Sequence, residues 1–553
     1  MSRLPKREGC SAKRATELDT QAELLKVLAL EIKTREALDG AVHGFSADFR
    51  SFASSMPHQT ILTVLEFMGV PKTWIDIFKR FLKAPLNMGP VIRGTADQVR
   101  TRNAGVPLAH GFEVFFGEAL LSCLDMAVSH KTSSDTAIPY LYRLRDVCRL
   151  VGTSQQSNEA INQINSFAKV MGLQVCIKDL FAGPGETIGF TTFKRSASQH
   201  QEKPGAVVTE INIAEVISSA HHVKKRLLSC SSVYELVYTW NKCVGTYAPH
   251  LVGSFANVFG KAHLEAVTKA YNLAYEIILE GKTLTEYFVA RFPSGSMPDA
   301  SFPFEAFIHL PAAYGGLGVK SPFVAINQAQ KILEDPNATL KGYLADEQKF
   351  YEQLREAFSK LTTKQREDKL RAIFNDDEER MVAVFGADYK TAIATFPPLE
   401  DLTANRERQP PLFSFPFTSN PFTPSGYNYP SAYPMPTYPT YLSSTPSLYS
   451  IYPDLLSQYL FLSDEPPKPL INASEKILDE VYRLSGEPGM KSWEKLSVDE
   501  KWAVGLYGEE CLERFGGLEM WWANGVPMEL MKVVRGLDDE DDDVSVSSYM
   551  SVA

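Results

Sequence analysis

Two aspartates in apolar segments have the greatest potential for chemistry in this chain. Asp48 closes the run Phe45–Phe49, and a helix N-cap is the simplest interpretation of its position. Asp146 follows Tyr142-Arg143-Leu144-Arg145; in a continuous strand it would share an apolar face with Cys148 and Leu150. If the chain instead turns at Asp146-Val147, the carboxylate lies at the tip of a hairpin. A buried carboxylate is costly without a partner or a metal ion, but one aspartate alone is a weak sign of catalysis.

Other catalytic classes find less support. The histidines His110, His221-His222 and His263 lack ligand spacing with any cysteine or acid, and the seven cysteines never form a C-x-x-C pair. No glycine-rich phosphate loop and no G-x-S-x-G element occurs. Scattered cysteines argue against a disulfide framework and fit a reducing, intracellular compartment, whether nuclear or cytoplasmic.

Charge is distributed unevenly along the 553 residues. The whole chain has a formal net charge of −10, yet residues 1–250 carry 29 Lys and Arg against 23 Asp and Glu. A mildly basic first half is compatible with a polyanionic partner, whereas the acidic second half would repel one. No apolar stretch is long enough for a membrane span, and the first residues have no apolar core typical of a secretory signal, so we expect no membrane association.

Hydrophobic periodicity predicts helices and strands in alternation, without the regular spacing of βαβ units. This pattern favours an α+β fold. The prediction includes helices over Leu18–Leu38, Trp74–Leu82, Phe112–Ala127 and Ala160–Met171, a loop or hairpin over Gly89–Gly105, strands over Ile138–Gly152 and Val207–Ile213, and two or three helices over Ala220–Gly281.

The segment Gln409–Pro453 has a composition unlike the rest of the chain. It contains no charged residue, eleven prolines and eleven Phe or Tyr residues. This density of proline excludes helix and central strand, so the segment is a linker or a ligand for an aromatic-lined groove on a protein partner, and we favour the linker. A small helical region with four tryptophans follows, and an acidic run, Asp538–Asp543, lies near the end.

The order of several short motifs resembles that in reverse transcriptases of the group II intron and retroelement type, and most closely a reverse-transcriptase-like family found in fungi. The likeness covers about residues 40–325. Its carriers, in chain order, are the Asp48 segment, Gly69-Val70-Pro71 with Trp74, Arg102-Asn103-Ala104-Gly105-Val106-Pro107, the Asp146 segment, Met171–Val175 with Lys178, and the turn Gly315–Val319.

The resemblance implies a right-hand polymerase palm with a helical thumb, and RNA-templated DNA synthesis with Mg²⁺ or Mn²⁺. Asp48 matches the palm aspartate and Asp146 the first of a pair in a hairpin, so both would be metal ligands on neighbouring strands. Lys178 loosely matches the lysine that protonates the leaving pyrophosphate. Arg102, Gly105 and Pro107 fall in the element that backs the template and the incoming base, Ala53 falls at the position facing the sugar, and Lys224, Lys225 and Arg226 fall on a thumb helix near the duplex.

Departures from the family pattern predict an impaired enzyme. Val147 stands where the second aspartate of the pair is expected, and Ala53 replaces an aromatic residue that excludes a 2′-hydroxyl. Only 47 residues precede Asp48, so we expect reduced fingers. The alternatives are a non-enzymatic nucleic-acid-binding or scaffold protein that keeps the fold, and a decaying retroelement copy. RNA or an RNA–DNA hybrid is the expected partner, bound weakly; a solvated helix face explains the Lys224–Arg226 cluster equally well.

These arguments predict seven consecutive regions. They are an N-terminal helix with a basic leader (1–40), a palm with reduced fingers (41–215), a helical thumb (216–325), a helical extension (326–400), a Pro/Tyr/Phe-rich linker (401–470), a small helical module (471–537) and an acidic tail (538–553).

Overall fold

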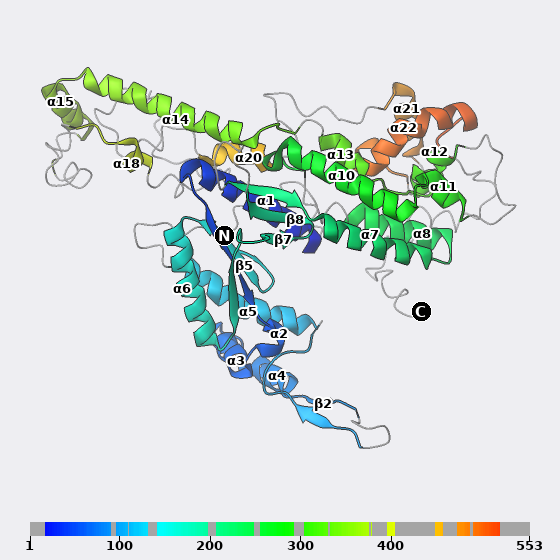
Figure 1. Ribbon diagram of the computed structural model, residues 1–553, viewed down its shortest axis with the longest axis horizontal. Helices are drawn as coiled ribbons and strands as arrows, with labels where there is room; N and C mark the ends of the chain where they lie inside the picture. Colours follow the sequence, from blue (N-terminus) through cyan, green and yellow to red (C-terminus); the bar gives the residue numbers. More distant parts are fainter. Residues whose placement is uncertain are drawn as a thin grey trace.

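The computed structural model contains both helices and antiparallel sheets, as expected for an α+β protein (Figure 1). In the described part of the chain, no helix is both long and apolar enough to cross a membrane, and none of the six described cysteines forms a disulfide. The structure describes residues 17–89, 96–108, 110–130, 141–196, 206–247, 255–291, 303–329, 332–374, 378, 395–403, 448–456, 473–486 and 490–519.

A four-stranded antiparallel sheet, in the order β4-β5-β1-β6, lies in the lower half of the molecule in Figure 1. Helices connect β1 to the β4–β5 hairpin, and a further helix connects β5 to β6. This succession of strands and helices is a split βαβ arrangement. The strands are β1 (His43–Phe49), β4 (Tyr142–Leu144), β5 (Val147–Gly152) and β6 (Val175–Asp179).

The two faces of this sheet differ in chemistry because side chains alternate along each strand. Phe45, Ala47 and Phe49 of β1 point into the largest hydrophobic core, together with Cys148 and Leu150 of β5. The opposite face, called here the polar face, carries Ser46, Asp48, Val147, Arg149, Cys176 and Lys178. Only one face of the sheet is therefore packed against the main core.

Four helices close that core. Helix α6 begins with a capping box formed by Thr153 and Gln156. It ends at Gly172, whose φ of 71° lies in the left-handed region that glycine adopts readily. Helix α5 is less buried at its start than its apolar sequence suggested, since Val114 is 66% exposed. The helices are α3 (His58–Phe67), α4 (Lys72–Leu82), α5 (Gly111–His130) and α6 (Ser154–Met171), with the short α2 (Phe52–Ser55) after β1.

A second core forms around α1 (Glu17–Leu38), which covers one end of the polar face. Val151 of β5 packs into this core, and the Tyr142 hydroxyl donates a hydrogen bond to Glu31 at 2.9 Å. The short helix α20 (Tyr452–Leu456) also packs here, with Leu455 fully buried. The prediction that proline excludes helix from the segment ending at Pro453 is therefore wrong at this end, because Pro453 lies in the first turn, where no N–H is needed. Most of Gln409–Pro453 lies outside the described residues.

A small sheet and a layer of helices lie in the upper part of Figure 1. The antiparallel sheet β7-β8-β9 joins the main sheet through the buried ion pair of Arg149 with Glu186, at 2.6 Å. Its strands are β7 (Glu186–Ile188), β8 (Thr191–Arg195) and β9 (Val207–Ile211). The helices are α7 (Ile213–Leu228), α8 (Val233–Trp240), the π-helical turn η1 (Asn241–Tyr247), η2 (Asn257–Phe259), α10 (Gly260–Leu279), α11 (Leu284–Val289), α12 (Phe304–His309), η3 (Ala312–Tyr314), α13 (Phe323–Gln328), α14 (Pro336–Ser359), α15 (Thr363–Phe374), α18 (Leu399–Thr403) and η7 (Leu448–Ile451).

The predicted small helical module contains α21 (Glu475–Leu484), η8 (Trp493–Lys495) and α22 (Val498–Phe515). It shares a core with Ala306 of α12 and with Leu310 and Tyr314, which follow α12. His309 stacks on Tyr507 with ring centroids 5.8 Å apart, and its Nδ1 donates a hydrogen bond to the Val319 carbonyl at 2.8 Å. The predicted acidic tail (538–553) lies outside the described residues, as do Trp521 and Trp522, two of the four tryptophans of the predicted module.

Several local predictions are corrected by the structure. Asp48 is in strand β1 and caps no helix. The predicted strand Ile138–Gly152 is a hairpin in its described part. The hairpin alternative for Gly89–Gly105 is confirmed, but its first strand lies before Gly89: the ribbon consists of β2 (Pro85–Asn87) and β3 (Val99–Thr101). Strands β6, β7 and β8 were not predicted, and α7 begins earlier than expected, at Ile213.

Candidate functional site

Strand pairing brings Asp48, on the polar face, close to Asp146, in the turn before β5. Asp48 of β1 lies opposite Val147 of β5 and opposite Cys176 of β6. Asp146 immediately precedes Val147 in the two-residue turn between β4 and β5, and its carbonyl accepts a hydrogen bond from the Phe49 amide at 3.2 Å. The hairpin alternative for Asp146 is therefore correct, and the continuous strand is wrong.

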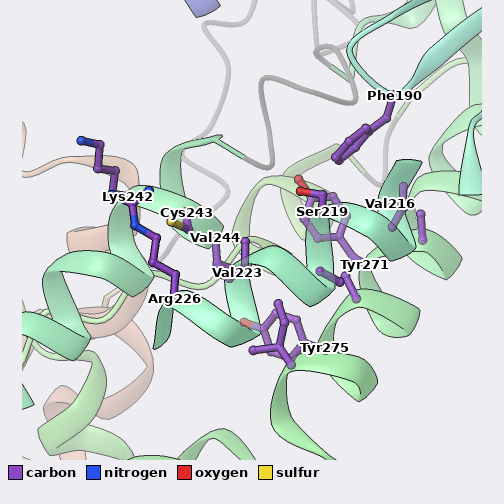
Figure 2. Close-up of a pocket in the computed structure, with 14 residues that line it drawn as sticks. Phe190, Val216, Ser219, Val223, Arg226, Lys242, Cys243, Val244, Tyr271 and Tyr275 are labelled. Atoms are coloured by element: carbon purple, nitrogen blue, oxygen red, sulfur yellow. The ribbon is translucent and has the colours of Figure 1, made fainter. Parts of the chain in front are cut away.

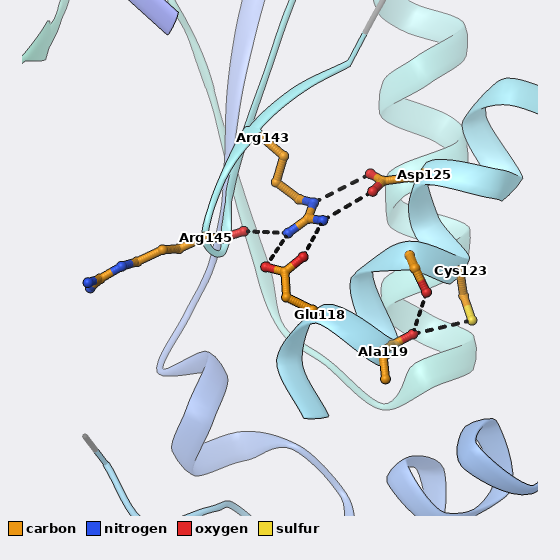
Figure 3. A network of polar contacts seen from close by, with 7 residues as sticks. Glu118, Ala119, Cys123, Asp125, Arg143 and Arg145 are labelled. Atoms are coloured by element: carbon orange, nitrogen blue, oxygen red, sulfur yellow. Dashed lines mark hydrogen bonds and ion pairs between the residues drawn. The ribbon is translucent and has the colours of Figure 1, made fainter. Parts of the chain in front are cut away.

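Arg143 holds this turn against helix α5 (Figure 3). Its guanidinium donates hydrogen bonds to both carboxylate oxygens of Glu118, at 2.9 and 2.7 Å, and to Asp125 at 3.4 and 3.1 Å. It also donates to the Arg145 carbonyl within the turn, at 3.2 Å. Burial disfavours the charge of Arg143, but these carboxylates outweigh that effect and raise its pKa. Arg143 thereby positions Asp146 without touching it.

The Arg145–Asp146 turn carries a local conformational cost. Arg145 has a φ of 54°, in the left-handed region that residues other than glycine seldom adopt. Figure 3 shows the Arg145 side chain pointing away from the Arg143 network. The hydrogen bonds of Arg143 help to offset this cost.

The electrostatics around Asp146 favour its protonated form. Burial raises the pKa of its carboxyl, and the nearby negative charges of Asp48 and Glu113 raise it further, although a backbone hydrogen bond and Arg145 oppose the shift. Arg50 lies beside the other aspartate: a hydrogen bond to Cys176 and the charge of Asp48 raise the pKa of its guanidinium. The two carboxylates therefore repel each other, and one of them has a cationic neighbour.

Lys178 lies on the same face as Asp48. It pairs in register with Ser46 on strand β1, two residues from Asp48, and its side chain is exposed. The strand register thus places Asp48 and Lys178 on one face, and Asp146 lies in the adjoining turn, where the charge of Asp48 acts on it.

Gly105 and Ala53 come together on the edge of the main core. The Val106 amide donates to the Ala53 carbonyl and the Gly105 amide to the Met56 carbonyl, each at 2.8 Å. Gly105 has a φ of 80°, and a Cβ atom there would lie 2.4 Å from the Ser54 carbonyl oxygen. Only glycine permits this close approach. Pro107, two residues on, is half-buried.

Arg102 is engaged within the protein. Its guanidinium donates to the Phe81 carbonyl at the end of α4, at 3.0 Å, and lies over the Phe81 ring. A side chain used in this way ties the β3 end to α4. Its predicted contact with a template would require these bonds to be exchanged.

The donor set does not fit a centre for two divalent cations. Asp48 and Asp146 supply two carboxylates, Val147 supplies no ligand atom, and Arg50 places a positive charge beside Asp48. Among the described residues, no group of three His, Cys, Asp or Glu side chains could hold a metal ion. Two divalent ions about 4 Å apart need more negative oxygen ligands than this face provides.

The predicted basic cluster on α7 is only partly available. Lys224 forms an ion pair with Glu280 at 2.7 Å, whereas Lys225 and Arg226 are exposed. Arg143 and Arg149 are likewise held in ion pairs. Fewer positive charges face outward than the sequence count suggested.

Sequence reasoning did not single out Arg50 or Glu118, and it included Arg143 only as part of the segment that precedes Asp146. Arg50 follows Asp48 by two residues, so period-two spacing along β1 was the available signal. Glu118 is 25 residues from Arg143, and nothing in the sequence pairs them.

Comparisons with known proteins give no family assignment. No family model matches the chain, and no curated protein matches it. Among solved structures, telomerase from Candida albicans in complex with the TWJ fragment of telomeric RNA matches at 10% identity, over 50% of this chain and 52% of that chain, with a TM-score of 0.28. Apo telomerase from Candida tropicalis matches at 10% identity over 48% and 47%, with a TM-score of 0.29. The chain spans about half the length of these telomerase chains, and such scores do not establish a common fold.

Proposed function

We propose that this chain is a reverse-transcriptase-like protein whose polymerase site has lost most or all of its nucleotidyl-transfer activity. The observation that carries the proposal is the pairing of β1 with β5, which sets Asp48 beside the hairpin of Asp146 on an open sheet face. The split βαβ order of the sheet and the docking of the Gly105 loop on α2 agree with a palm, and the helices from α7 onward would be the thumb.

Loss of activity follows from the chemistry of the polar face. Phosphoryl transfer needs strong stabilisation of negative charge, which polymerases obtain from two metal ions. Val147 removes one carboxylate, and Arg50 partly neutralises another. Any residual activity would depend on Mg²⁺ or Mn²⁺ held by Asp48 and Asp146 together.

Primer extension on a primed RNA template tests the proposal. The wild-type chain should extend the primer feebly or not at all, and Val147→Asp should increase extension in a manner that depends on Mg²⁺ or Mn²⁺. Val147→Asn is the matched control, since it has the same shape as the aspartate without its charge. Robust extension by the wild-type chain that disappears in Asp146→Asn would refute the loss of activity. Equal extension by both Val147 variants would refute the role assigned to the missing carboxylate.

The second candidate is a non-enzymatic nucleic-acid-binding or scaffold function. Ion pairing of Arg143, Arg149 and Lys224 reduces the number of cations available for such binding. Arg50 and Lys178 at the polar face, and Lys225 and Arg226 on α7, are exposed cations that can contact phosphates without catalysis. We expect weak, sequence-indifferent binding of an RNA–DNA hybrid. Binding that is undetectable at low salt would remove this candidate.

A further inference from the structure

A cavity of about 310 Å³ lies between α7, the π-helical turn η1 and α10. Its middle is apolar: Val216 and Val223 come from α7, Val244 from η1, and Ala274 and Ile278 from α10. Its size and composition are those of small-molecule sites, which are mostly apolar with a few polar groups. π-Helical turns are rare and often accompany functional sites, and η1 supplies three lining residues here.

The two ends of the cavity have different chemistry (Figure 2). Arg226 and Lys242 lie on one side of Val223 and Val244, while Ser219, Tyr271 and Phe190 lie on the other. Both cations act on the same thiol: burial raises the pKa of Cys243, and the charges of Arg226 and Lys242 oppose that rise. One end is therefore positively charged.

The opposite end holds a polar group with an unmet hydrogen bond. Tyr271 is only 4% exposed, and its hydroxyl finds no hydrogen-bond partner among the residues that the structure describes. A buried hydroxyl without a partner costs about 1–3 kcal/mol, so most such groups in native proteins are satisfied. A molecule in the cavity could satisfy it.

We propose that this cavity binds an amphipathic organic anion, with its carboxylate at Arg226 and Lys242, an apolar body along the valines, and a hydroxyl or carbonyl group at Tyr271. A purely aliphatic tail would leave the Tyr271 hydroxyl unsatisfied, and an uncharged molecule would gain no attraction from the positive charges of Arg226 and Lys242. The proposal is independent of any activity at the polar face, because the cavity lies among α7, η1 and α10.

Matched probes test both ends on the full-length chain. The probe is 4′-hydroxybiphenyl-4-carboxylate, with 4-hydroxycinnamate and 4-hydroxybenzoate as shorter versions, measured by calorimetry. Removing the hydroxyl (biphenyl-4-carboxylate) should weaken binding about fivefold, as expected for one net hydrogen bond. Replacing the carboxylate with a carboxamide should weaken it about tenfold, because hydrogen bonds to charged groups are stronger.

Protein variants should erase these differences selectively. In Tyr271→Phe, the hydroxylated and unhydroxylated probes should bind equally; in Arg226→Ala with Lys242→Ala, the carboxylate and carboxamide should bind equally. Tyr234→Phe and Lys269→Ala change exposed residues that do not line the cavity and should alter neither ratio. Thermal melting checks that each variant is folded. The proposal would be overturned if none of the three probes binds at millimolar concentration. It would also be overturned if the cavity variants leave unchanged the affinity ratios of hydroxylated to unhydroxylated probe and of carboxylate to carboxamide.

Discussion

The polar face and the cavity between α7 and α10 are built in opposite ways. On the polar face, backbone pairing of adjacent strands sets the positions of a few charged groups, which repel one another or find ion-pair partners. In the cavity, apolar side chains from three separate segments leave a space, and the polar groups lie at its ends. Short sequence motifs predicted the first region, whereas of the second region they included only Arg226. On the sheet, the strand register determines which residues of short sequence motifs lie side by side. Between the helices, the packing of residues from separate segments determines the site.

Gly105→Ala should produce the largest effect on the sheet region. The new Cβ would combine left-handed strain with a backbone clash against Ser54, so the free energy of unfolding should fall by roughly 3–5 kcal/mol. Urea denaturation measures it. Gly89→Ala is the control: its φ is 72°, but a Cβ there has nothing within 4 Å, so a loss of about 1–2 kcal/mol is expected. Equal losses would mean that the loop does not pack tightly on α2.

Arg143→Ala should release the hairpin and destabilise the protein by about 1–2 kcal/mol. The loss is moderate because the side chains of Glu118 and Asp125 are 53% and 46% exposed and can be hydrated when the arginine is removed. Denaturant unfolding gives the stability, and hydrogen exchange at the Phe49 amide reports on the turn. Arg145→Ala, which removes an exposed side chain from the same turn, should change stability by less than about 0.5 kcal/mol. Similar losses in both variants would contradict the positioning role of Arg143.

Asp146→Asn should stabilise the protein at neutral pH by less than about 1 kcal/mol, since the site remains partly hydrated. The pKa of Asp146 is raised in the folded state, so the folded chain holds the proton more tightly than the unfolded chain. The charged carboxyl therefore lowers stability above its folded-state pKa, and this penalty disappears when the pH falls below the usual carboxyl range. A series of unfolding measurements from pH 3 to 7 checks the trend. Asp76→Asn, at an exposed position of α4, is the control. If Asp146→Asn stabilised the protein only at low pH, the predicted direction of the pH dependence would be wrong.

The smallest predicted effect separates the neighbouring lysines of α7. Lys225→Ala should reduce the slope of RNA–DNA hybrid affinity against salt concentration by the amount expected for about one phosphate contact. Lys224→Ala should reduce it less, because Lys224 already pairs with Glu280. A titration of binding against salt concentration measures both slopes. Equal reductions would show that the ion pair opens on binding, and the basic cluster would then act as a whole.

Much of the local structure could be predicted because it depends on neighbouring residues. The apolar spacing of Leu18–Leu38 predicted α1, and the predicted helix Ala160–Met171 ends at the last residue of α6. The proline-rich segment was mispredicted at Leu448–Leu456, where burial of Leu455 in the core around α1 stabilises a short helix despite Pro453. Strand β6 was missed because Val175–Asp179 is only five residues long, too short for its alternation to distinguish a strand, and its pairing with β1 defines it.

By itself, the sequence determined the α+β character, the order of the motif residues and the absence of a third carboxylate at Val147. The tertiary structure decided that Asp48 belongs to a strand between β5 and β6, that Asp146 lies in a turn held by Arg143, and that Lys224 is engaged by Glu280. It also created the cavity at Tyr271. The physical reason is range: helix periodicity and caps act over a few residues, whereas register, ion pairs and cavities join residues that are distant in the chain and meet only when the fold is complete.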